Sequence, residues 1–154
     1  MNWLPAMLSN PYLITPITSW LAAQVLKTII YAIVNRKFDI TRMTGDGGMP
    51  SGHSATVTSL AVIAALLCGV GSFQFAVCAI LAIIVCHDAM GVRLETGKQA
   101  EVINDLIEII DVLTTEELPE VKLKELVGHT PIQVLAGIFV GICNAVFMYY
   151  AFFL

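Results

Sequence analysis

Four apolar stretches, each close to the length of a membrane-spanning helix, constrain the fold of this chain more than any other feature. A helix needs about 17–25 mostly apolar residues to cross the hydrocarbon core of a bilayer. Stretches near that length lie at residues 12–34, 53–70, 73–90 and 131–154. Charged residues make up only 13% of the 154 residues, against about 25% in soluble domains. We therefore expect an all-α integral membrane protein, a single domain built as a bundle of about four transmembrane helices with short amphipathic surface helices.

The distribution of charge predicts the orientation of the bundle. All Lys, Arg, Asp and Glu residues lie between Lys27 and Glu125, most of them in two polar segments, 35–52 and an insertion at 91–130. Counting four spans places both segments on the same face of the membrane. By the positive-inside tendency we expect this face to be cytoplasmic, in a bacterial cell membrane. The net charge of −4 argues against a nucleic-acid partner, which requires a basic patch.

The insertion itself contains two amphipathic patterns. In "QAEVINDLIEIIDVL", residues 99–113, apolar and acidic side chains alternate at helical spacing. The pattern predicts a helix that lies on the membrane or packs over the helix ends. "TTEELPEVKLKELVG", residues 114–128, predicts a second short helix with Thr115 as its N-cap.

The motif "GGMPSGHSA", residues 47–55, is a polar loop at the start of the second span. Gly47 and Gly48 permit backbone conformations that other residues avoid, and Pro50 suits the first turn of a helix. The following residues would place N–H groups and hydroxyls at a helix N-terminus, which attracts anions. His53 falls in that first turn. The motif therefore predicts a phosphate cradle with a proton donor beside it.

Several further polar residues are expected at the same end of the bundle. Gln24 and Lys27 lie inside the first apolar span, where a lysine is costly and is by default a functional candidate. Arginine is the usual partner of phosphate oxygens. The remaining candidates on this face are Arg36, Arg42, Arg93 and His129. Together they indicate a site for a phosphate group.

No cofactor or metal is expected. Asp88 follows His87 and can pair with Arg93, and an alternative is that it joins His53 or His87 around a metal. The spacing of these residues fits no standard metal site. The four cysteines match neither a disulfide framework nor a zinc motif.

The motifs resemble those of a known enzyme superfamily. They are "QVLK", "NRKFD", "GGMPSGHSA", "DAMGVR", "GKQAEVIN" and "GHTPIQVLAG", in order over nearly the whole length. "MPSGHSA" resembles the central motif of the type 2 phosphatidic acid phosphatases, which are related to the vanadium-dependent haloperoxidases. The chain as a whole is similar to the small divergent branch of that superfamily.

The resemblance implies roles for individual residues. In the intact P-S-G-H motif, Ser51 and Gly52 would bind phosphate and His53 would protonate the leaving oxygen. The lysine-arginine motif of the family is K-x₆-R-P. Lys27 fits its lysine, but the next arginine, Arg36, lies nine residues on rather than seven and no proline follows. We expect both side chains to bind phosphate.

The third family motif, S-R-x₅-H-x₃-D, has two possible registers. Both use Arg93 to bind phosphate. The standard spacing puts Gln99 at the histidine position and Ile103 at the aspartate position, and glutamine is no nucleophile. The second register, which we prefer, takes His129 as the nucleophile with Gln133 four residues later as its orienting partner. The insertion would then split the motif.

These residues favour a membrane-embedded phosphatase that acts on a lipid phosphate or lipid pyrophosphate through a phospho-histidine intermediate, with Asp88 in a supporting position. Gln133 departs from the family pattern because an amide orients a histidine without supplying charge. Two alternatives therefore stay open: a catalytically weak or inactive protein that binds anionic lipids as a scaffold, and a lipid phosphotransferase.

One motif bears on assembly. "GIFVG", residues 137–141, is a small-xxx-small pattern that permits close helix contact. It serves either within the bundle or across a homodimer, and the sequence leaves both open.

Overall fold

The structure is a computed structural model that describes residues 3–43, 47–113, 123 and 128–154. Within these ranges the chain is helical with short connections and contains no strand, so the predicted all-α class is confirmed. The elements are α1 (Trp3–Leu8), α2 (Pro11–Asn35), the 3₁₀ helix η1 (Ile40–Met43), α3 (Gly52–Cys68), α4 (Phe73–Met90), α5 (Val92–Leu113), α6 (Pro131–Met148) and the π-helix η2 (Tyr149–Phe153).

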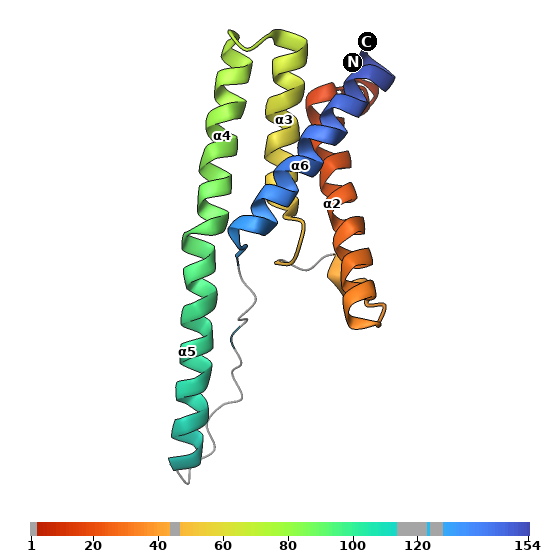
Figure 1. The fold of residues 1–154 in the computed structure, drawn as a ribbon. Helices are drawn as coiled ribbons and strands as arrows, with labels where there is room; N and C mark the ends of the chain where they lie inside the picture. Colours follow the sequence, from red (N-terminus) through yellow and green to blue (C-terminus); the bar gives the residue numbers. More distant parts are fainter. Residues whose placement is uncertain (1–2, 44–46, 114–122, 124–127) are drawn as a thin grey trace.

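Three helical stretches of the described chain are long and apolar enough to cross a membrane: Pro11–Asn35, Phe73–Asp111 and Pro131–Phe153. The predicted membrane class is thereby confirmed. The remaining predicted span, 53–70, corresponds to α3, which has 17 residues and is therefore about 26 Å long. Figure 1 shows both chain termini at the same end of the bundle as the α3–α4 turn. The starts of α3 and α6 lie toward the opposite end.

α3 occupies the centre of the bundle and packs against α2, α4 and α6. Its buried positions are mostly small residues: Gly52, Ser54, Ala55, Val57, Ser59, Ala61, Ile63 and Ala64. The α6 glycines of the "GIFVG" motif face this surface. A Cβ atom added at Gly141 would lie 2.6 Å from the carbonyl oxygen of Ala55, and one at Gly137 would clash with that of Ser51. The small-xxx-small pattern is therefore used inside the bundle, and the homodimer stays a prediction.

A polar contact fixes α6 against α2. The Asn144 side-chain amide donates to the hydroxyl oxygens of Ser19 at 2.8 Å and Thr18 at 2.9 Å, and approaches the carbonyl oxygen of Thr15 at 3.2 Å. Hydrogen bonds between membrane helices contribute about 0.6–2 kcal/mol each. The contact therefore joins α6 directly to α2.

α5 departs from the expectation for the insertion. The predicted helix at 99–113 begins earlier, at Val92, and follows α4 after the single residue Gly91. Figure 1 shows α5 extending in line with α4, away from the other helices, instead of packing over their ends. The backbone can continue because Gly91 N–H donates to the carbonyl oxygen of His87 and Glu95 N–H to that of Gly91. Thr115 and almost all of the second predicted helix lie outside the described residues.

We expect Gly137→Ala to destabilise the bundle, because the added methyl group meets the backbone of α3 at Ser51. Overpacking of this kind costs about 1–3 kcal/mol. Gly71→Ala is the matched control, since a Cβ atom there has no neighbour within 4 Å. Thermal unfolding in detergent should show a lower midpoint for Gly137→Ala alone. Equal midpoints for the two variants would contradict the close α3–α6 contact.

Candidate active site

The polar loop ends in a capped helix start. Gly47 and Gly48 have φ angles of 78° and 82°, which glycine adopts without strain. α3 then begins at Gly52 with Ser51 as its N-cap, so Pro50 precedes the cap and does not occupy the first helical turn as expected. The Ser51 hydroxyl oxygen accepts from the Ser54 N–H at 3.3 Å and from the Ser54 hydroxyl at 3.1 Å.

Ser51 also joins α3 to α6. Its side chain is fully buried, and its N–H donates to the Gln133 carbonyl oxygen at 3.0 Å. Gly52 follows as the first residue of the helix, where an N–H has no acceptor within the helix itself. A Cβ atom on Gly52 would lie 3.2 Å from Cδ1 of Trp20 on α2. The absence of a side chain thus lets the start of α3 approach α2 closely.

Lys27 enters this site from α2. It is 6% exposed, so the residue as a whole is buried. Gly48 packs over its stem: a Cβ atom there would lie 3.4 Å from both Cγ and Cδ of Lys27. The glycine loop therefore closes over the lysine. A buried cation of this kind favours an anionic ligand.

His129 is held in place through both its backbone and its ring. Its N–H donates to the Ala89 carbonyl oxygen at 3.0 Å, near the end of α4. Its ring Nδ1 lies 3.3 Å from the Gln133 side-chain oxygen. That oxygen also accepts from the Thr130 N–H at 3.1 Å. Because the amide oxygen is an acceptor, Nδ1 carries the proton in this contact and the Nε2 lone pair is left for chemistry.

The electrostatics of the site favour the neutral form of His129. Burial lowers the pKa of His129 below its usual range, and the positive charges of His53 and Lys27 act in the same direction. The hydrogen bonds to Gln133 and to the Gly48 backbone oppose this shift. A neutral imidazole can act as a nucleophile or a base through its unprotonated ring nitrogen.

His53 faces His129 from the first turn of α3. The two ring centroids are 6.0 Å apart with an interplanar angle of 61°. Their side chains come from positions 76 residues apart in the sequence. The site thus brings together a buried cation, the start of a helix and two imidazoles, which is a set suited to phosphoryl transfer.

Comparison with known proteins identifies the family of this chain. The model of the divergent PAP2 family matches residues 8–144. The chain belongs to the divergent PAP2 family. It is also 42% identical to the uncharacterized membrane protein YuiD of Bacillus subtilis (strain 168), over 95% of this chain and 98% of that protein. No solved structure matches the chain.

In this divergent PAP2 protein, five of the residues predicted from the sequence lie around one site: Lys27, Gly52, His53, His129 and Gln133. Ser51 adjoins them as the cap of α3. This geometry favours the second register of the third motif. In the first register, Gln99 and Ile103 are exposed on α5, whereas His129 is 3% exposed and faces His53.

Three predicted residues lie elsewhere or are only partly described. Arg36 is exposed and caps the C-terminal end of α2 with a left-handed φ of 52°. It lies nine residues from Lys27, which is about 13 Å along the helix. Arg93 is the second residue of α5, and its side chain is outside the described part of the structure. Asp88 lies in the last turn of α4, next to Ala89.

Sequence reasoning missed three contributors to the site. Gly48 covers Lys27, Ala89 anchors the His129 backbone, and Trp20 packs against Gly52. In the sequence, Gly47 and Gly48 indicated a turn, but they did not indicate that the turn packs against Lys27. Gln24, recognised as polar within an apolar span, is 5% exposed, and its Oε1 has no hydrogen-bond partner among the described residues. For metal binding, the described residues contain no group of three His, Cys, Asp or Glu side chains placed to hold an ion.

Proposed function

We propose that this protein hydrolyses a lipid phosphate or lipid pyrophosphate through a phospho-histidine intermediate. The observation that carries the proposal is the pair of imidazoles beside the buried Lys27, with the His129 ring centroid 6.0 Å from that of His53 and Nδ1 directed at Gln133. Family membership supports the same chemistry. The apolar helices around the site favour a lipid substrate over a soluble one.

The reaction proceeds in two displacements. In the first, Nε2 of His129 attacks phosphorus, a P–N bond forms, and the P–O bond to the leaving group breaks as His53 donates a proton to that oxygen. In the second, water attacks the phospho-histidine, gives its proton to neutral His53, and releases inorganic phosphate and free His129. The atoms and protons balance over the cycle, and no redox partner is needed.

The remaining residues supply charge and position. The Lys27 ammonium neutralises the phosphoryl oxygens, and the Gly52 N–H at the start of α3 donates to them. Arg93, by resemblance, adds a second cation. Gln133 keeps the proton of His129 on Nδ1. We propose that the site faces the cytoplasm, supported by the concentration of Lys and Arg in the two polar segments.

A second candidate function is binding of anionic lipid without turnover. Gln133 favours it, because its side chain already completes a capping box with Thr130 at the start of α6. Helix capping is therefore a sufficient reason for glutamine at position 133, without a role in catalysis. The buried lysine and the helix start would still hold a phosphate group.

Phosphate release from a panel of purified lipid phosphates and pyrophosphates, in detergent, separates the two candidates. We expect release from at least one lipid by the wild-type protein, with measurable turnover. If the protein binds a lipid phosphate but releases no phosphate from any member of the panel, the binding protein replaces the hydrolase. Transfer of the phosphoryl group to an added alcohol in place of water would identify a phosphotransferase.

A further inference from the structure

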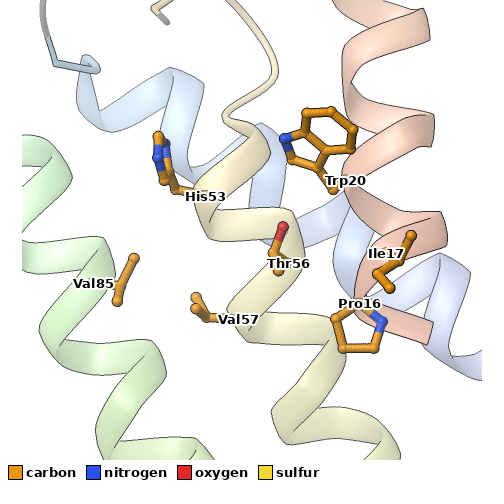
Figure 2. A pocket seen from close by; sticks show the side chains of 7 residues that line it. All are labelled: Pro16, Ile17, Trp20, His53, Thr56, Val57 and Val85. Carbon is orange, nitrogen blue, oxygen red and sulfur yellow. The ribbon is translucent and has the colours of Figure 1, made fainter. Parts of the chain in front are cut away.

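An apolar pocket of about 400 Å³ lies directly beside the candidate active site. Its walls come from three helices: Pro16, Ile17 and Trp20 on α2, His53, Thr56 and Val57 on α3, and Val85 on α4. Figure 2 shows α2 and α4 flanking α3, with the lining side chains on the face of α3 turned away from α6. The volume lies within the range of small-ligand pockets, about 300–1,000 Å³.

The chemistry of the walls suits hydrocarbon. The Thr56 hydroxyl donates to the Gly52 carbonyl oxygen at 2.7 Å, so its hydrogen is already used within α3. Apart from Thr56 and His53, the lining side chains are aliphatic or the indole of Trp20. Because the three helices are membrane spans or pack among them, the open side of the pocket meets the bilayer. A polar ligand would find few partners there.

The pocket and the candidate active site share two residues, His53 and Trp20. His53 lines the pocket and also faces His129, and Trp20 lines it while packing against Gly52. The pocket therefore ends at the His53 ring, beside the His129 ring, and its other walls are almost wholly apolar. An anionic head and a hydrocarbon chain on the same molecule match the active site and the pocket.

We propose that the groove between α2, α3 and α4 seats the hydrocarbon chain of the lipid phosphate whose head group lies at His53 and His129. The proposal rests on the function proposed above for the substrate class, but it concerns binding and not turnover. The pocket holds one hydrocarbon chain, specifically the part of that chain that immediately follows the phosphate. A second chain, where the lipid has one, stays in the bilayer.

The fluorescence of Trp20 reports whether the pocket is occupied. The chain contains two tryptophans, so Trp3→Phe leaves Trp20 as the single tryptophan. Hexadecyl phosphate brominated along its chain should quench Trp20 with a saturable dependence on concentration. The equally brominated hexadecanol, which lacks the phosphate anchor, should quench weakly and without saturation. Identical quenching by the two compounds would show only general contact with detergent-bound chains and would overturn the seat.

A pair of variants on α4 tests the position of the seat. Val85→Phe fills the pocket, whereas Ile84→Phe makes a similar change on the exposed neighbouring residue outside it. We expect Val85→Phe, made in the Trp3→Phe background, to weaken binding of hexadecyl phosphate by about tenfold relative to Ile84→Phe. Binding of butyl phosphate, measured by competition, should be equal in both. Partitioning of hexadecyl phosphate into detergent is the same for both variants, so it cancels in the ratio of their binding constants.

The outcomes distinguish this inference from the proposed function. If no lipid phosphate is hydrolysed but saturable quenching persists and is lost in Val85→Phe, the proposed binding of the hydrocarbon chain is supported and the proposed hydrolase activity is contradicted. If both variants bind and hydrolyse butyl and hexadecyl phosphate alike, the hydrolase activity is supported and the proposed binding of the hydrocarbon chain in this pocket is contradicted. Unchanged helical circular dichroism in the two variants ensures that the comparison is between folded proteins.

Discussion

Replacing His129 with alanine should reduce phosphate release from the lipid substrate by at least about 10³-fold, because His129 forms the covalent phosphoryl intermediate in the proposed reaction. His129 combines burial, a lowered pKa and an oriented ring, which are the properties of an activated nucleophile. The variant should still fold, because residue 129 contacts Ala89 of α4 through its backbone N–H and not through its side chain. Steady-state release of inorganic phosphate measures the loss.

His87→Ala is the matched control for this loss. It removes the same side chain from an exposed position on α4, and we expect its release rate to stay within about twofold of wild type. Acid-labile, base-stable labelling of wild type with substrate radiolabelled at phosphorus, absent in His129→Ala, would locate the intermediate. Release at the wild-type rate in His129→Ala would remove His129 from the nucleophile role.

The apolar helices of this protein were predictable because they rest on local signals. Apolar runs marked 73–90 and 12–34, and the structure has α4 at Phe73–Met90 and α2 at Pro11–Asn35. The cap of α6 was equally local: Thr130 and Gln133 are three residues apart and satisfy each other at a helix start. His129 and Gln133 lie on either side of the same helix start, so their contact is local as well. The roles that the preferred motif register gives them stay predictions.

The parts that were not predictable depend on how separate helices rotate against each other. Nothing local indicates that Gly48 closes over Lys27, or that Ala89 accepts from His129 forty residues later. The use of Gly137 inside the bundle instead of between subunits was open for the same reason, since a small residue permits contact without naming the partner. Arg36 shows the converse. Its place in the sequence suggested the site, but the left-handed cap that ends α2 leaves it exposed.

Gln133→Glu should increase the rate of phosphate release by about 10²-fold. A carboxylate in place of an amide beside Nδ1 stabilises the positive charge that develops on the ring during attack, and exchanging a carboxylate for an amide in a catalytic triad costs about 10⁴-fold. The smaller gain reflects the 3.3 Å separation, which is longer than the 2.7–2.9 Å of charge-assisted hydrogen bonds. The capping box should persist, because glutamate is its usual partner at this position.

The pH dependence separates this effect from a change in folding. In the wild type, attack requires neutral His129, and its lowered pKa places the loss of activity at acidic pH, below the usual histidine value of about 6.5. The carboxylate of Gln133→Glu favours the protonated ring and should move this acid limb to higher pH. Gln133→Met, which has no comparable acceptor, should lower the rate and leave the limb at or below its wild-type position. If Gln133→Glu is slower than wild type at every pH, Gln133 does not act on the charge of His129 and serves the helix cap alone.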